Sequence, residues 1–217
     1  PALYAALARA GRLVAVADVR GFGETKSDQN VQDRQLPYYH SRGGTDADFT
    51  YAAFLLGRPM LGLRVADALA ALQVLRARPD VSPDQVVVAG RGWAALIAAF
   101  AGALDRKTTG VAAEGAPASY AEVLRNDNYA LPVSQMLPGV LKEFDLEDVY
   151  AALAPRPLLL LNPVNAETRR LDRAEARAAL AGVTAAYPAG QRQALSIDVA
   201  PFETDTAARL KQWILEH

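Results

Sequence analysis

QVVVAGRGWA, residues 85–94, is a β-branched run that ends in two glycines and continues into an alanine-rich apolar segment. β-Branched residues favour strands, and glycine allows sharp backbone turns that other residues resist. Apolar positions repeat at helical spacing from Trp93 to Leu104, and most of the other positions there are alanine. We therefore predict a strand, a tight turn at Gly90–Gly92 and a helix that is buried almost all round.

Short apolar runs alternate with helical stripes along the rest of the chain. This alternation indicates βα units joined by right-handed crossovers. We predict the α/β class, with a mostly parallel sheet and helices on both faces, in a single domain spanning residues 1–217. Further strands are expected at Leu13–Ala17, Gly110–Ala113, Pro157–Leu161 and Ala194–Val199, and further helices at Pro1–Ala10, Leu61–Leu75, Asp172–Ala186 and Thr204–Leu215.

Two segments lack a sustained period. Lys26–Phe49 is polar and contains glycine, and it is predicted to be a long loop at the rim of a pocket, with His40 in it. Ser119–Asp148 is interrupted by Pro132 and Pro138, and it is predicted to be a helical excursion that forms a cap.

The composition excludes several classes of function. A net charge of -1 gives no electrostatic footprint for nucleic acid, and no apolar run reaches the roughly 18 residues that span a bilayer. Nothing at the start resembles a signal peptide, so a soluble protein is expected. Without cysteine there are no disulfides, thiolate nucleophiles or cysteine-bound zinc, and we predict no cofactor. The histidines are His40 and His217, the second at the chain end, where fraying is expected.

The candidate site is the carboxyl edge of the predicted sheet, because ligands of parallel α/β sheets bind beyond the strand ends. The segments expected there are Asp18, Gly90–Trp93, Glu114, Asn162–Asn165 and Asp198–Pro201. The carboxylates among them show no metal-ligand spacing on one element, so no metal site is predicted. The candidate pocket residues are Asp18, His40, Arg91, Trp93, Glu114, Asn162, Asn165 and Asp198.

Three segments resemble α/β-hydrolases, two of them the acetyl xylan esterase and dienelactone hydrolase branch. The longest is LLGRPMLGLRVADALAALQVLRARPDVSPDQVVVAGRGWAA, Leu55–Ala95, and the second is DVYAALAPRPLLLLNPVNA, Asp148–Ala166. The third, ADVRGFGET at residues 17–25, is similar to a turn that follows a strand in many α/β-hydrolases. The resemblance implies an α/β-hydrolase fold, a serine at the strand-to-helix turn, and structural roles for Asp18 and Arg20.

The sequence departs from this family at all three catalytic positions. The serine of the family's GxSxG turn is replaced by Gly92, which offers no nucleophile. The catalytic acid falls at or near Asn165, whose neutral amide cannot hold an imidazolium, and Glu167 or Asp172 would replace it only with a differently built loop. No histidine occurs in residues 198–202, where the resemblance places the general base.

A fourth departure concerns the start of the chain. The family places a central strand just before the helix that here begins at Pro1, so the predicted fold lacks its N-terminal strands. Either the chain is a piece of a longer polypeptide or the sheet is rebuilt without that strand, because an open gap would leave backbone groups unpaired.

Three functions are weighed. The first is a catalytically silent domain of the esterase type that serves structurally or binds a neighbouring hydrolase domain or a small ester or carbohydrate-like ligand. The second is a carboxyl-ester hydrolase that uses non-standard residues or residues outside this chain. The third is interaction through Lys26–Phe49 and Ser119–Asp148, which predicts an exposed apolar patch around Phe49, Tyr51 and Met136.

The residues beside Gly92 predict which side chains occupy the position where the family's catalytic groups would lie. Gly92 is expected in a left-handed or strained conformation, because the helix must leave the strand abruptly. Trp93 can cover apolar surface, and Arg91 is predicted to pair with Glu114 or Asp198 where the catalytic relay would lie. The competing interpretation is an open cleft in which Arg91 meets an anionic ligand such as a sugar acid or another carboxylate.

Overall fold

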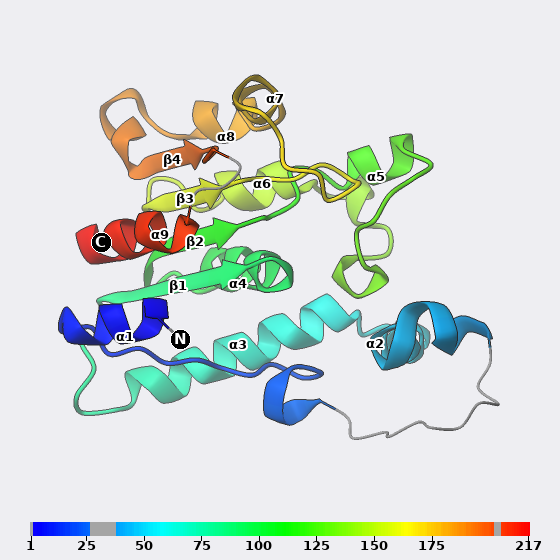
Figure 1. Ribbon diagram of the computed structural model, residues 1–217, viewed down its shortest axis with the longest axis horizontal. Helices are drawn as coiled ribbons and strands as arrows, with labels where there is room; N and C mark the ends of the chain where they lie inside the picture. The colour runs from blue at the N-terminus through cyan, green and yellow to red at the C-terminus, as the bar shows by residue number, and fades with distance from the viewer. Residues whose placement is uncertain (1, 27–37, 202–204) are drawn as a thin grey trace.

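A parallel sheet forms the centre of the part of the chain that the structure describes (Figure 1). The computed structural model describes residues 2–26, 38–201 and 205–217, and for residues 38–45 the backbone alone. All three strand pairs are parallel, which confirms the predicted sheet. Its strands are adjacent in chain order: β1 (Val86–Arg91), β2 (Thr108–Glu114), β3 (Leu158–Leu161) and β4 (Leu195–Asp198).

Helices cover both faces of this sheet, as predicted. A small core forms where Leu210 and Trp213 pack on alternate residues of β2 and β3, and a larger core covers the opposite face. No helix of the described ranges is long and apolar enough to cross a membrane. The helices are α1 (Ala2–Arg9), α2 (Tyr38–Leu55), α3 (Met60–Arg76), α4 (Trp93–Leu104), α5 (Ala121–Arg125), α6 (Leu146–Ala151), α7 (Arg173–Ala179), α8 (Ala181–Ala186) and α9 (Thr206–Glu216), with 3-10 turns at Gly23–Thr25, Val133–Gln135, Val140–Lys142 and Ala189–Ala194.

Helix α4 is the central helix of the larger core, as its alanine-rich sequence predicts. Residues 95–99 are all buried, and the small side chains let the helix backbone approach the sheet closely. At Gly102 an added Cβ would lie 2.3 Å from a methyl carbon of Val111, so no larger residue fits there without displacing β2. The composition of the helix therefore sets its distance from the sheet.

The predicted strand at Leu13–Ala17 is wrong. These residues form no strand and have no backbone hydrogen bond to any residue in the described ranges. Leu13 is 47 % exposed and Val16 is 64 % exposed. The run has the composition of a buried strand, but no strand of the described residues pairs with it.

The predicted loop Lys26–Phe49 is also wrong in its second half, where α2 begins at Tyr38. The buried residues Ala47, Thr50 and Ala53 recur on one face of this helix, a pattern that the glycines earlier in the segment obscured. Residues 27–37 lie outside the described ranges, so the first half of the prediction is not tested.

The buried guanidinium of Arg64 joins α2 and α3 to the turn at residues 18–25. It pairs with Asp46 of α2, donates to the Arg20 carbonyl oxygen at 3.1 Å and lies 4.5 Å from the centre of the Phe22 ring. Arg20 pairs with Asp67 of α3 in turn. These contacts fit the structural role that the resemblance implied for Arg20.

The helix predicted over Asp172–Ala186 is divided into α7 and α8 at Leu180. Asp172 caps α7 by accepting from the backbone N–H groups of Ala174 and Glu175.

The apolar patch predicted for the third function is present only in part. Phe49 and Tyr51 are 45 % and 50 % exposed, whereas Met136 packs against the larger core.

Segment Ser119–Asp148 folds back on the larger core through the carboxylate of Asp145. This group accepts from the Ser119 hydroxyl at 2.5 Å, and from the backbone N–H groups of Tyr120 and Leu146, each at 2.6 Å. It also begins α6 in a capping box with Asp148. Burial raises the pKa of Asp145, but these hydrogen bonds outweigh it, and the net pKa lies below the ordinary value.

We expect Asp145→Asn to lower the free energy of unfolding by about 1–2 kcal/mol at pH 7, because an amide accepts these bonds less well than a carboxylate. A carboxyl whose pKa is lowered by folding stabilises the fold above its unfolded pKa, and that stability is lost as pH falls through the folded pKa. Urea unfolding from pH 7 down to pH 2 should therefore show a shallower loss of stability in the variant. The exposed Asp127→Asn is the control, and equal acid slopes in the variant and the wild type would contradict the assignment.

Candidate functional site at the carboxyl edge of the sheet

The turn from β1 into α4 has the predicted sharp geometry. Gly92 lies at φ 56° and ψ −120°, a region that only glycine occupies without strain, which confirms the expectation. Gly90 is needed for a different reason, because an added Cβ would lie 2.0 Å from the Ala94 carbonyl oxygen. An added Cβ at Gly92 would meet no heavy atom within 4 Å. The turn therefore presents position 92 to open space.

An ion pair lies directly beside this turn. Arg91 and Glu114 are register partners on β1 and β2, and Arg91 Nε lies 2.5 Å from Glu114 Oε2. Thr206, at the start of α9, donates to Glu114 Oε1 at 2.6 Å and accepts from Arg91 Nη2 at 3.2 Å. The Glu114 side chain is 12 % exposed and that of Arg91 is 56 % exposed. The predicted pairing of Arg91 is thus confirmed for Glu114.

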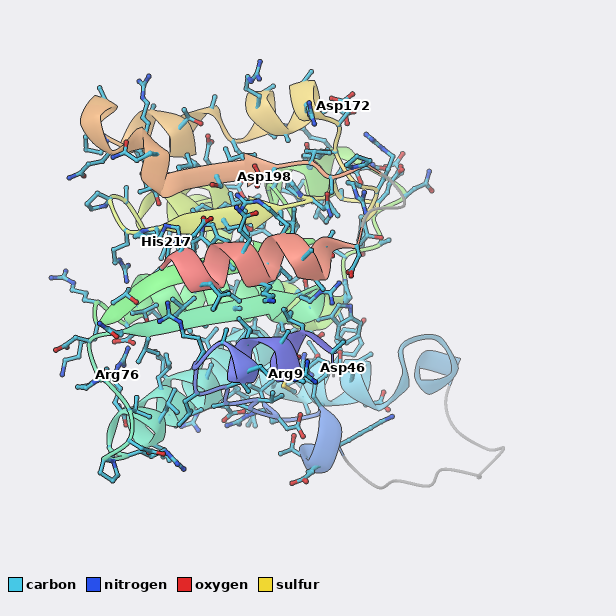
Figure 2. All side chains as sticks on the ribbon, turned by 60° about the vertical axis from the view of Figure 1, so that its left-hand side comes forward. Arg9, Asp46, Arg76, Asp172, Asp198 and His217 are labelled. Carbon is cyan, nitrogen blue, oxygen red and sulfur yellow. The ribbon has the colours of Figure 1, made fainter. Side chains whose placement is uncertain are left out.

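Asp198, the other predicted partner of Arg91, pairs with Arg209 of α9 at 2.7 Å instead. The neighbouring Asn162 is buried at a positive φ of 51°. Its side-chain oxygen accepts from the Ala200 N–H at 2.9 Å, and its own backbone N–H donates to the Asp198 carbonyl oxygen at 2.7 Å. These two hydrogen bonds connect the chain just beyond β3 with the end of β4, where Figure 2 labels Asp198.

Asn165, at the position of the family's catalytic acid, organises the loop that it lies in. Its side-chain oxygen accepts from the backbone N–H groups of Glu167 at 3.1 Å and Arg169 at 2.9 Å. Asp172, a candidate replacement acid, is the cap of α7, and Glu167 accepts from Asn126 at 3.1 Å. None of these three groups approaches an imidazole within the described residues.

Of the remaining predicted pocket residues, Asp18 and Trp93 contact the turn at residues 18–25, and the prediction for His40 is not tested. Asp18 accepts from the Glu24 N–H at 3.0 Å and stabilises its own turn. Trp93 is 42 % exposed and makes an edge contact with Phe22, so it does not fill the site as expected. His40 lies in α2, and its side chain lies outside the description.

His217 is ordered against α9 rather than frayed. Its ring stacks on Trp213 with ring centroids 4.5 Å apart, and Nδ1 lies 2.9 Å from the Trp213 carbonyl oxygen. The length of α9 places this ring about 16 Å along the helix from Thr206, too far to act at Gly92. Among the described residues no group of histidine and acidic side chains has metal-ligand geometry.

A cleft of about 700 Å³ opens beside the ion pair. The sequence analysis did not pick out Thr168, Arg169 and Arg170, which line it, although two adjacent arginines soon after a buried strand were a usable signal. Arg169 pairs with Glu175, and Arg170 donates to the Ala200 carbonyl oxygen. The arginines of the cleft are therefore engaged by the protein itself, which disfavours the open anion receptor. The cleft is lined by Arg91, Gly92, Glu114, Gly115, Asn162, Val164, Thr168, Arg169 and Arg170.

Comparison with known proteins supports the resemblance at the level of the fold. The chain aligns over 86 % of its length with the structure of a putative acetyl xylan esterase from Bacteroides fragilis NCTC 9343, with a TM-score of 0.63 and 18 % identity. The fold is α/β-hydrolase-like. The sequence is also 27 % identical over 121 residues to the putative hydrolase YtaP of Bacillus subtilis (strain 168).

The chain spans less than half the length of both relatives, 46 % of the esterase chain and 40 % of YtaP. No protein-family model matches the sequence. These comparisons therefore support distant homology to hydrolases and esterases.

Replacing the two glycines of the turn should have unequal effects. Gly90→Ala forces a contact with the backbone of α4, so we expect a loss of about 3 kcal/mol or more in the free energy of unfolding. Gly92→Ala meets no atom and incurs only the strain of a positive φ, about 1–2 kcal/mol. Chemical denaturation of both variants checks this order, and a larger loss for Gly92→Ala would contradict the described turn.

The ion pair predicts a pattern of single and double variants. Arg91→Ala should lower the free energy of unfolding by about 1–2 kcal/mol, because it leaves the shielded Glu114 unpaired, while the exposure of Arg91 limits the loss. Adding Glu114→Gln should restore most of it. Arg78→Ala, which removes an exposed pair, is the matched control and should leave stability essentially unchanged. A double variant no more stable than Arg91→Ala would show that the two side chains are not coupled.

Proposed function

We propose that this chain is a catalytically silent α/β-hydrolase-like domain with a structural role beside a neighbouring hydrolase domain. The ion pair of Arg91 and Glu114 beside the empty turn carries this proposal. It lies next to Gly92, where a nucleophile and its base would have to meet the substrate. The site thus holds a structural contact between β1, β2 and α9 in place of reacting groups.

Among the described residues, each role of acyl transfer lacks a group that performs it. Gly92 carries no hydroxyl, and the amide of Asn165 is used to form a loop. A serine at position 92 would also lack a base among the side chains that the structure describes, and a hydroxyl that keeps its proton is a poor nucleophile. Loss of general-base assistance alone removes about 10²–10⁴ in rate.

The partner is inferred from the size of the relatives. Both are more than twice as long as the part that this chain matches. A small ester or carbohydrate-like ligand in the cleft is the competing role. The geometry favours it less, because Asn162, Asn165 and Arg169 already bind other parts of the protein.

A chromogenic acetyl ester assay tests catalytic silence directly. We expect the purified protein and its Gly92→Ser variant to give hydrolysis equal to that of buffer, since no base lies within reach of position 92 among the described side chains. The Gly92→Ala variant is the matched control for the backbone change. Hydrolysis above the buffer rate by the wild-type protein or by Gly92→Ser would overturn the proposal if a serine-reactive phosphonate abolishes it. That result would favour the ester hydrolase.

A further inference from the structure

A second pocket, of about 570 Å³, lies between α5 and α7. Its remaining wall is the loop that follows β3, which extends toward α5 in Figure 1. The Ala130 N–H donates to the Ala166 carbonyl oxygen at 2.8 Å, and the Asn126 amide donates to Glu167 at 3.1 Å, so these walls are joined by hydrogen bonds. The pocket shares only Arg169 with the cleft beside the ion pair. Its volume is within the range of small-molecule sites.

Glu122, in the first turn of α5, brings to this pocket a carboxylate that no described group binds. Its Oε2 atom is buried without a hydrogen-bond partner, and no other hydrogen bond or ion pair joins its side chain to the described residues. Charged oxygens that are removed from water normally have a donor, because losing hydration without a partner is costly. A cationic donor in the pocket would therefore compensate this carboxylate.

Arg125 supplies the opposite charge to the same pocket. It follows Glu122 by three residues, and residues three apart on a helix are neighbours, with Cβ atoms about 5–6 Å apart. Its exposed side chain has no hydrogen bond or ion pair to a described residue, Glu122 included. Two opposite charges thus lie on one side of α5, and each lacks a partner within the described ranges.

The other charged residues of the pocket bind each other. Arg169 donates to both carboxylate oxygens of Glu175, at 2.8 Å and 3.0 Å. The hydrogen bond to Arg169 lowers the pKa of Glu175 to about 2, so this pair stays ionised at neutral pH. Of the described residues that line the pocket, Glu122 and Arg125 are therefore the two whose charges are left for a ligand.

Part of the pocket wall is apolar. The buried residues Ala166 and Leu171 line it from the loop after β3, and Ala178 and Ala179 line it from α7. Methyl and methylene groups bury favourably against such a wall. A ligand that matches the whole lining has an aliphatic body and carries one ammonium group and one carboxylate group.

We propose that this pocket binds a small aliphatic amino acid as its zwitterion. The ammonium group donates to the Glu122 carboxylate, and the ligand carboxylate accepts from Arg125, whose planar guanidinium matches a carboxylate in geometry. The bond to Glu122 is the stronger of the two, because that carboxylate is partly shielded from water whereas Arg125 is exposed. This proposal does not depend on whether the domain is catalytic.

Amide NMR titration of the 217-residue chain with L-valine at pH 7 tests the proposal. Two analogues each remove one charge: isovalerate lacks the ammonium group, and isobutylamine lacks the carboxylate. We expect L-valine to shift the Ala166 and Ala179 amides saturably and to leave the Gly92 amide unchanged. Isovalerate should bind at least about tenfold more weakly, because it leaves Glu122 without a donor. Isobutylamine should bind about threefold more weakly, because the contact that it loses is exposed.

Variants of the two charged residues locate the site. Glu122→Gln keeps the shape of the side chain and removes its charge, so it should weaken L-valine binding at least about tenfold. Arg125→Gln should weaken L-valine binding about threefold and leave isobutylamine binding unchanged. The exposed Asp127→Asn and Arg177→Gln, which lie outside the pocket lining, are the matched controls and should bind L-valine as the wild type does.

Three results would each overturn the proposal. The first is the absence of shifts at Ala166 and Ala179 up to about 10 mM L-valine, since a site with a Kd of about 1 mM would be nearly saturated there. The second is equal affinity for L-valine and isovalerate. The third is a folded Glu122→Gln variant that binds L-valine as tightly as the wild type. If the amide spectrum shows that this variant is unfolded, the two analogues on the wild-type protein decide.

Discussion

The close approach of Gly90 to the Ala94 carbonyl is the constraint on which the rest of the site depends. At 2.0 Å from an added Cβ, this carbonyl excludes every residue except glycine. The contact sets the angle at which α4 leaves β1, and the alanines of α4 then pack closely across β1 and β2. The close packing of α4 on the sheet therefore requires this turn. Its geometry remains that of a nucleophile-bearing turn even though Gly92 bears no nucleophile.

The ion pair of Arg91 and Glu114 stabilises the strand ends beside this turn. A catalytic centre keeps polar groups ready to react at the strand ends, and groups of this kind are costly when they lack partners. Here Arg91 pairs with Glu114, and Thr206 donates to Glu114 and accepts from Arg91. Because Thr206 begins α9, the contact also joins this helix to the strand ends. The site therefore contributes to the packing of the smaller core, where Leu210 and Trp213 follow on the same helix.

The sequence was most informative where one local pattern decides the outcome. The VVVAGRG run predicted strand, turn and the positive φ of Gly92, because backbone sterics alone determine them. The sequence predicted that Arg91 pairs with either Glu114 or Asp198. The register of β1 and β2, which places Arg91 opposite Glu114, decides between them. Thr206 could not be found, since it lies 115 residues from Arg91 and reaches it through the placement of α9. The helix α2 was missed because its buried face includes a threonine and small alanines.

The segment Leu13–Ala17 shows why a correct pattern can give a wrong element. Its apolar run and the VVVA of β1 both have the composition of strands with neighbours on each side. A strand, however, exists only when a second strand accepts its hydrogen bonds, and this condition is not local to either run. Both runs border the same groove, and both expose residues that their sequences suit for burial. Both mismatches lie along one groove, so each run has the pattern of a strand whose neighbour the described residues do not supply.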